Sequence, residues 1–133
     1  MDPVLIAQIA LVLVVFHALL LSAAGMVWAA KNLLHFYRHE SCGKCTPCRE
    51  GGNWLLQMLD KIDRGEGTMR DIDLLMSVAD NIAGKTLCAF GDAAATPVLT
   101  TIKQFRHEYE AHVTEGRCTC PSDWRARQPV AAH

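Results

Sequence analysis

The sequence predicts an all-α protein in which one N-terminal transmembrane helix precedes a small helical bundle. The stretch from Val4 to Ala30 contains no Lys, Arg, Asp or Glu, and apolar residues further along recur at helical spacings of three and four. No run shows the alternation of apolar and polar residues that is typical of strands. At 133 residues, the chain allows one small domain with an appendage. We expect a transmembrane helix over residues 1–30, a helical domain over 31–115 and a flexible tail over 116–133.

The N-terminal apolar segment is long enough to cross a bilayer. A helix from Val4 to Ala30 would extend roughly 40 Å, which exceeds the ~30 Å hydrocarbon core. Lys31 and Arg38 follow the segment, and the positive-inside rule then places the helical domain in the cytoplasm. A signal peptide is the alternative, but the first three residues lack the positive charge with which such a peptide begins.

The first helices of the bundle are predicted by their apolar spacing and their ends. A short helix is expected over residues 32–40, and a second over about 47–64, with Gly65 placed to end it. The third begins after Thr68, which has Asp71 in the capping-box position. Its apolar residues recur at spacings of three, four and three, and they are Ile72, Leu75, Ala79 and Ile82.

The last helix is expected to begin at Thr96 and Pro97, because a capping residue followed by proline is typical of helix starts. Its apolar stripe consists of Val98, Ile102, Phe105, Tyr109 and Val113. Two histidines, His107 and His112, lie off this stripe, and we expect both to be solvated.

Three cysteines within seven residues indicate a metal centre. Cys42, Cys45 and Cys48 form a C-x2-C-x2-C pattern, and Cys88 follows after a helical interval. This spacing lets three sulfurs reach three irons of one cubane, and a distant cysteine can bind the fourth. Structural zinc usually takes two separated pairs of ligands, so it fits less well. The sequence therefore favours a [4Fe–4S] cluster, with zinc and disulfides as open alternatives.

The residues around the cysteines suit such a cluster. Thr46 and Pro47 are expected to start a helix, which would place Cys48 in its first turn, where free amides point outward. Those amides, with Lys44 and Arg49, would offset the negative charge of the cluster and raise its reduction potential, although both side chains could also be ordinary surface charges. Two glycines, Gly43 and Gly51, would allow the backbone to approach the cluster closely.

Several classes of function find no support in the sequence. The formal net charge of −1 does not suggest a nucleic-acid partner. There is no G-x-G-x-x-G and no G-x-x-x-x-G-K-[ST], so no nucleotide-binding loop is visible. Cys118 and Cys120 form a C-x-C pair in the tail, which suits either a metal or redox site or incidental cysteines, and two ligands alone do not close a metal site.

The segment from Glu40 to Gly51 reads E-S-C-G-x-C-x-P-C-R-x-G. It resembles the iron–sulfur motif of the 51 kDa NADH-binding flavoprotein subunit of respiratory complex I. The likeness continues through residues 84–95, similar to the segment with the family's fourth cluster ligand, and through 105–108. It covers roughly residues 31 to 113 in all. Two linked motifs at matching separation are more specific than one short pattern.

The resemblance implies one-electron transfer through a [4Fe–4S] cluster in the NADH-dehydrogenase module of an NADH:quinone oxidoreductase. By motif position, the implied ligands are Cys42, Cys45, Cys48 and Cys88, and the ligand loop contributes Ser41, Gly43, Lys44 and Arg49. The family's FMN and NAD residues have no matching positions, so we do not expect this chain to bind those cofactors or to be catalytic alone. The expected partners are other subunits of a respiratory complex, both flavin and iron–sulfur proteins.

The sequence leaves three alternatives open. The first is an electron-transfer module of an NAD-linked hydrogenase or formate dehydrogenase, because flavoprotein subunits of those enzymes share the module. The second is a zinc-stabilised interaction domain, and the third is an exported domain held by disulfides.

The N-terminal segment has a separate resemblance. Residues 1–29 look like the first transmembrane helix of the quinone-site membrane subunit of complex I, the H-type subunit. Together with the charge pattern, this predicts a single-pass protein of a bacterial-type inner (plasma) membrane, with the iron–sulfur domain on the cytoplasmic side.

Overall fold

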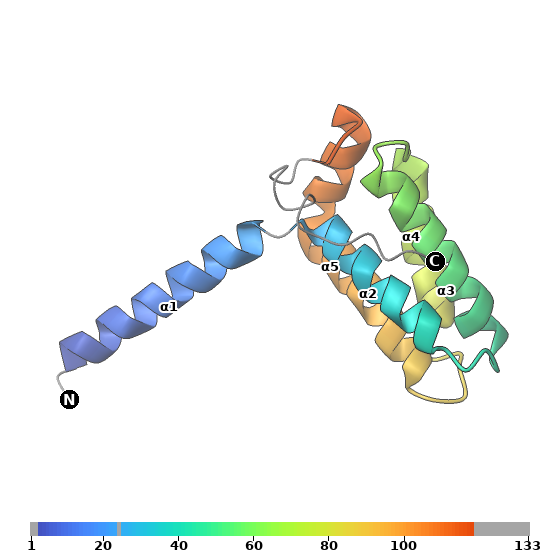
Figure 1. The fold of residues 1–133 in the computed structure, drawn as a ribbon, viewed down its shortest axis with the longest axis horizontal. Helices are drawn as coiled ribbons and strands as arrows, with labels where there is room; N and C mark the ends of the chain where they lie inside the picture. The colour runs from blue at the N-terminus through green and yellow to red at the C-terminus, as the bar shows by residue number, and fades with distance from the viewer. Residues whose placement is uncertain (1–2, 24, 119–133) are drawn as a thin grey trace. The chain divides into compact units, whose positions relative to one another are not determined.

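The computed structural model describes the backbone of residues 3–23 and 25–118, and the side chains of residues 4–15 and 25–118. Within these ranges the chain is helical and contains no strand, in agreement with the all-α expectation. The helices are α1 (Pro3–Ala23), α2 (Met26–Glu40), α3 (Thr46–Asp63), α4 (Met69–Ile82) and α5 (Phe90–Glu115), as labelled in Figure 1. The chain divides into two compact units, of which the first contains α1 and the second spans Met26–Thr119.

The predicted transmembrane helix is wrong. Among the residues that the structure describes, no helix combines the length and the apolar character that crossing a membrane requires. The placement in a bacterial-type inner membrane, and the membrane contact through residues 1–30, are corrected with it. The apolar run is not one helix, because α1 ends at Ala23 and α2 begins at Met26. The side chains of Val27 and Ala30 are fully buried in the bundle, so the end of this run is apolar because it packs against other helices.

The second unit is a four-helix bundle (Figure 1). α2 packs against α3 and α5, and α4 packs against the same two helices. Each helix therefore turns an apolar stripe toward a common core, as amphipathic helices do. The largest contributions to this core come from Leu34, Leu55, Leu59, Ile62, Ile72, Leu75, Ile82, Ile102 and Tyr109.

The helix predicted after Thr68 is confirmed. The Thr68 hydroxyl accepts a hydrogen bond from the Asp71 amide at 3.3 Å, and the Asp71 carboxylate accepts one from the Thr68 amide at 2.7 Å. These two bonds form the capping box. The four residues of the predicted apolar stripe are all buried, so the spacing of three and four identified the face that packs on α3 and α5.

The helix expected to start at Thr96 begins earlier, at Phe90, so Pro97 lies inside α5. Proline removes one backbone donor, which weakens a helix but does not prevent it where packing is favourable. The preceding turns are well packed, since Ala95 is fully buried and Gly91 is buried as well. Tertiary burial therefore outweighs the local start signal at Thr96 and Pro97.

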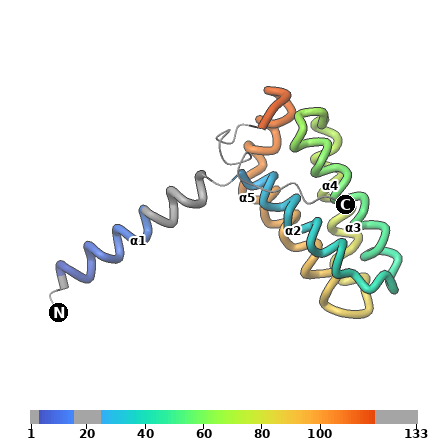
Figure 2. Tube along the Cα trace, viewed as in Figure 1, coloured from blue at the N-terminus to red at the C-terminus, as the bar shows by residue number. Residues whose placement is uncertain are grey.

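Two connecting loops lie at the same end of the bundle. Residues 41–45 join α2 to α3, and residues 83–89 join α4 to α5. Figure 2 shows both loops together at the lower end of the second unit. An edge-to-face ring pair between Tyr37 and Phe90, with centroids 5.6 Å apart, connects the end of α2 to the start of α5 beside them. The cysteine triplet and the loop with Cys88 are thus brought to one place.

Candidate metal centre

The start of α3 holds the cysteine loop in shape. Cys45 is the N-cap residue, with extended backbone angles (φ −90°, ψ 127°), and its carbonyl accepts the first helical bond from the Arg49 amide at 2.9 Å. The helix thus starts one residue before the position that was expected from Thr46 as the cap. Cys48 still lies in the first turn, as predicted, where backbone amides have no partner within the helix.

Arg49 braces the loop from the other side. Its Nη1 donates to the Gly43 carbonyl at 2.8 Å, and its Nε donates to the Glu50 carboxylate at 2.8 Å. Gly43 has φ +71°, a left-handed conformation that favours glycine. Arg49 therefore fixes the conformation of the turn at Gly43, and the Glu50 carboxylate partly offsets the positive charge of Arg49. Lys44 lies between the first two cysteines of the triplet and is exposed.

Ser41 connects the loop to a cysteine sulfur. The Gly43 amide donates to the Ser41 hydroxyl oxygen at 3.3 Å, and that oxygen lies 3.5 Å from Sγ of Cys48. Because the Ser41 oxygen already accepts a hydrogen bond from the Gly43 amide, the Ser41 hydroxyl proton is well placed to donate to a Cys48 thiolate. Hydrogen bonds to cysteine sulfur are among the features that set the potential of a cluster.

The second loop reaches the first through its backbone. The Leu87 amide donates to Sγ of Cys45 at 3.4 Å, across 42 sequence positions. The neighbouring Cys88 carbonyl accepts from the Thr86 hydroxyl at 2.8 Å. A Cβ on Gly91 would collide with the Thr86 side chain, so a glycine is needed for this loop to lie against the start of α5. The residue before Cys88 is therefore already in contact with the triplet.

These residues fit an iron–sulfur cluster. Cys42 and Cys88 are exposed, while Cys45 and Cys48 are partly buried, so none of the four cysteines is enclosed in the core of the bundle. No disulfide joins the five described cysteines. Each of the four irons of a cubane binds one cysteine sulfur. The four sulfurs must therefore surround the cluster, farther apart than four ligands of a single metal ion would be. Cysteines that come from two neighbouring loops and from the first turn of α3 suit that requirement.

Gly51 has a different role from the expected one. A Cβ at this position would lie 2.7 Å from Cδ1 of Ile82. Gly51 is buried in α3 and faces α4, so it allows two helices to pack closely. The prediction that it serves an approach to the cluster is not supported by this packing.

The structure also assembles a group that the sequence did not predict. Asp63, His112 and Cys118 each offer one ligand atom, and these atoms lie within 4.8 Å of one another. His112 was expected to be solvated, and it is fully buried. It lies off the apolar stripe of α5, so periodicity gave no signal, and only the C-x-C pattern indicated a metal ligand here. The partner cysteine of that pattern, Cys120, and the rest of the predicted tail from residue 119 lie outside the described residues.

Comparison with known proteins identifies the family. Residues 28–112 match the family described as the NADH-ubiquinone oxidoreductase-F iron-sulfur binding region. This match contains the cysteine triplet, Cys88 and most of the bundle, from residue 28 to His112. It begins at residue 28 and so gives no support to the resemblance of residues 1–29 to the H-type membrane subunit.

Individual relatives agree with this match. The F subunit of the NADH-quinone oxidoreductase of Streptomyces coelicolor is 51% identical over 113 residues, which covers 80% of this chain and 25% of the relative. The mitochondrial NADH-ubiquinone oxidoreductase 51 kDa subunit of Neurospora crassa is 47% identical over 91 residues, covering 68% of this chain and 18% of the relative. The chain thus spans about a quarter or less of these curated relatives.

A solved structure has the same fold. The NAD+-reducing [NiFe]-hydrogenase in the H2-reduced state matches with a TM-score of 0.64 and 33% identity, over 68% of this chain and 16% of that one. The same family is indicated by the cysteine loops, by the bundle that positions them and by the extent of the sequence match. The chain belongs to the NADH-ubiquinone oxidoreductase-F iron-sulfur binding region family, and it carries the family's 4Fe–4S binding region.

Proposed function

We propose that this chain transfers single electrons through a [4Fe–4S] cluster, as part of the NADH-dehydrogenase module of an NADH:quinone oxidoreductase. The ligands are Cys42, Cys45, Cys48 and Cys88. When bound, the cluster supplies a one-electron redox centre, and the protein sets its potential through charge, burial and hydrogen bonds to sulfur. Its partners are other flavin and iron–sulfur subunits of a respiratory complex. FMN and NAD are bound outside this chain.

The ligand loop tunes the site in three ways. The Ser41 hydroxyl, 3.5 Å from Sγ of Cys48, stabilises the thiolate. Arg49 holds the Gly43 carbonyl at 2.8 Å and keeps the turn in the shape that the triplet requires. Lys44 is exposed and lies between Cys42 and Cys45 in the sequence, and a positive charge near a cluster favours its more negative, reduced state. The hydroxyl and the positive charge both raise the reduction potential.

One observation supports this function above the others. The Leu87 amide meets Sγ of Cys45 at 3.4 Å, so the loop that contains Cys88 touches the triplet within a match to a 4Fe–4S family. A zinc-stabilised interaction domain would need its ligand atoms grouped around a single ion. Among the described residues, the group that meets that spacing is Asp63, His112 and Cys118, and not the triplet.

A second candidate is the electron-transfer module of an NAD-linked hydrogenase. The observation that favours it is the likeness to the NAD+-reducing [NiFe]-hydrogenase, with a TM-score of 0.64. Both candidates use the same cysteines and the same one-electron chemistry. They differ in the subunits that accept the electrons, so co-purification of native partners would separate them.

The test is anaerobic purification of the full chain, with iron and sulfide analysis and a visible spectrum before and after dithionite. We expect about four irons and four sulfides per chain, with bleaching on reduction. Cys88→Ala should lose the cluster. Cys118→Ala is the matched control, because it removes a cysteine outside the proposed ligand set, and it should retain the cluster.

Two results would contradict the proposal. One zinc per chain without visible absorbance would favour the zinc-stabilised domain. Iron content that is unchanged in Cys88→Ala and lost in Cys118→Ala would show that the ligand set is wrong.

A further inference from the structure

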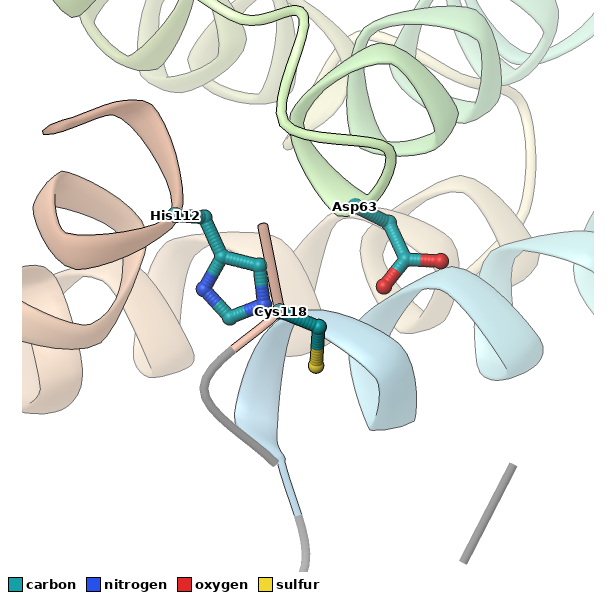
Figure 3. A group of neighbouring side chains, drawn as sticks. All are labelled: Asp63, His112 and Cys118. Carbon is teal, nitrogen blue, oxygen red and sulfur yellow. The ribbon is translucent and has the colours of Figure 1, made fainter. Parts of the chain in front are cut away.

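We propose that Asp63, His112 and Cys118 form a second metal site, which binds a divalent ion of the zinc class at the opposite end of the bundle from the cysteine triplet. α3 begins beside the triplet and ends at Asp63. Its 18 residues would separate the two sites by roughly 27 Å. Figure 3 shows the carboxylate, imidazole and thiol side chains facing a common space.

The buried imidazole of His112 is the strongest evidence for a metal ion at this site. Its side chain is fully buried, and its Nδ1 lies 2.8 Å from the Glu108 carbonyl oxygen. A carbonyl can only accept, so Nδ1 carries the proton and Nε2 carries the lone pair of the neutral ring. That buried Nε2 has no hydrogen-bond partner. Metal-binding histidines typically donate the other ring N–H to a backbone carbonyl in this way, which fixes the tautomer and orients the ring.

Asp63 is oriented by a neighbour. Only 4% of its surface is exposed, and its Oδ2 accepts a hydrogen bond from Nζ of Lys31 at 2.7 Å. Metal-binding carboxylates are typically held by hydrogen bonds from neighbouring residues. The bond from Lys31 to one oxygen of the buried Asp63 carboxylate is of this kind. Lys31 belongs to α2, so a third helix supports the site.

Backbone geometry brings Cys118 to the other two residues. α3 and α5 are both followed by a glycine with positive φ, Gly65 at +77° and Gly116 at +63°. A Cβ on Gly65 would collide with the Gly116 carbonyl, so the two helix ends approach more closely than other residues would allow. This contact places Cys118, two residues after Gly116, within 4.8 Å of the Asp63 and His112 ligand atoms.

The donor set indicates the class of metal. A thiolate, an imidazole nitrogen and a carboxylate oxygen together match the mixed ligands that zinc accepts, whereas calcium and magnesium prefer oxygen alone. Three protein ligands leave a fourth position of a tetrahedral ion for solvent. The ion would connect the end of α3 to the segment after α5, and binding to the folded state alone would stabilise the bundle.

The test is anaerobic titration of zinc into the full chain with its iron–sulfur cluster loaded, so that the triplet is occupied. Calorimetry in the presence of a weak competing chelator should detect one zinc per chain for the wild type and a higher Tm after zinc is added. Cys118→Ala should weaken zinc binding at least tenfold and lose the rise in Tm. His112→Gln should do the same, and circular dichroism checks that this buried substitution keeps the fold.

Cys120→Ala is the matched control, because it removes the other cysteine of the C-x-C pair, and it should bind zinc as the wild type does. Zinc-edge X-ray absorption should report one sulfur ligand and otherwise nitrogen and oxygen. No zinc bound by the wild type, equal binding by Cys118→Ala, or two or more sulfur ligands would each overturn the proposal.

Discussion

The backbone amide of Leu87 donates a hydrogen bond to Sγ of Cys45 at 3.4 Å. This bond joins the two loops that contain Cys42, Cys45 and Cys88, and Cys48 follows the first loop in the first turn of α3. It uses only the backbone of Leu87, a residue that is 84% exposed. The contact therefore depends on the course of the loop and not on the leucine side chain, which allows the two contributions to be separated by mutation.

Leu87→Pro should lower the reduction potential of the cluster by on the order of tens of mV. Proline has no N–H, so Cys45 loses a donor that favours the more negative reduced state. Leu87→Ala keeps the N–H and should retain the wild-type potential. Redox titration of both variants measures the difference, and equal potentials would contradict a role for this hydrogen bond.

Gly51→Ala should destabilise the bundle by about 1 kcal/mol, because the overpacking cost of about 1–3 kcal/mol exceeds the gain of about 0.5–1 kcal/mol from replacing a helical glycine by alanine. The added Cβ would lie 2.7 Å from Cδ1 of the buried Ile82. Gly52→Ala is the matched control in the same helix, because nothing lies within 4 Å of its Cβ position, and it should stabilise by about 0.5–1 kcal/mol. Denaturant unfolding of the two variants should show opposite signs, and a loss in both would contradict the close approach at Gly51.

Asp71→Asn should lower the free energy of unfolding by about 1 kcal/mol at pH 7. The hydrogen bond from Lys61 at 2.8 Å, followed by those from Thr68, holds the pKa of Asp71 below its ordinary value of 3.8, although burial opposes the shift. The stability from this carboxylate is thus present above pH 3.8 and is lost as the pH falls through the lower, folded-state pKa.

The difference between the wild type and Asp71→Asn should therefore shrink in acid, which denaturant unfolding between pH 7 and about pH 2 measures. Asp80→Asn, an exposed acidic position in the same helix, serves as the control and should have little effect. A difference between the wild type and Asp71→Asn that does not change with pH would contradict the role of the charge.

Tyr109→Phe should remove a component of alkaline unfolding. Burial raises the pKa of Tyr109 from 10.0 to about 12, although its hydrogen bond with Thr101 opposes the shift. The neutral phenol stabilises the fold fully below pH 10.0, and this contribution is lost as the pH rises through about 12. The variant should cost about 1 kcal/mol at neutral pH through the lost 2.8 Å bond to Thr101.

Unfolding measured from pH 8 to about pH 11.5 should then show a smaller loss of stability for Tyr109→Phe than for the wild type. Tyr37→Phe is the control, because the ring contact with Phe90 does not need the hydroxyl. A Tyr109→Phe profile that is parallel to the wild-type profile would contradict the prediction.

Features that depend on residues close together in the chain were predictable from the sequence. Three cysteines in seven residues indicate a metal centre, because this spacing lets three sulfurs reach three irons of one cluster. The capping box at Thr68 and Asp71 and the stripe from Ile72 to Ile82 are also local. Such patterns need only a few helical turns, so they can be recognised before any tertiary contact is known.

Contacts between the surfaces of separate helices could not be predicted in this way, because they depend on how the helices pack. An apolar run does not say whether lipid or other helices cover it, and for the end of this run the packing of Val27 and Ala30 in the bundle core gave the answer. The positions of His112 and Cys118 gave no sign that both would approach Asp63, which is about 50 residues earlier in the sequence. That meeting depends on two glycine-ended helices approaching each other, because distances between separate elements are set by packing and not by local propensity.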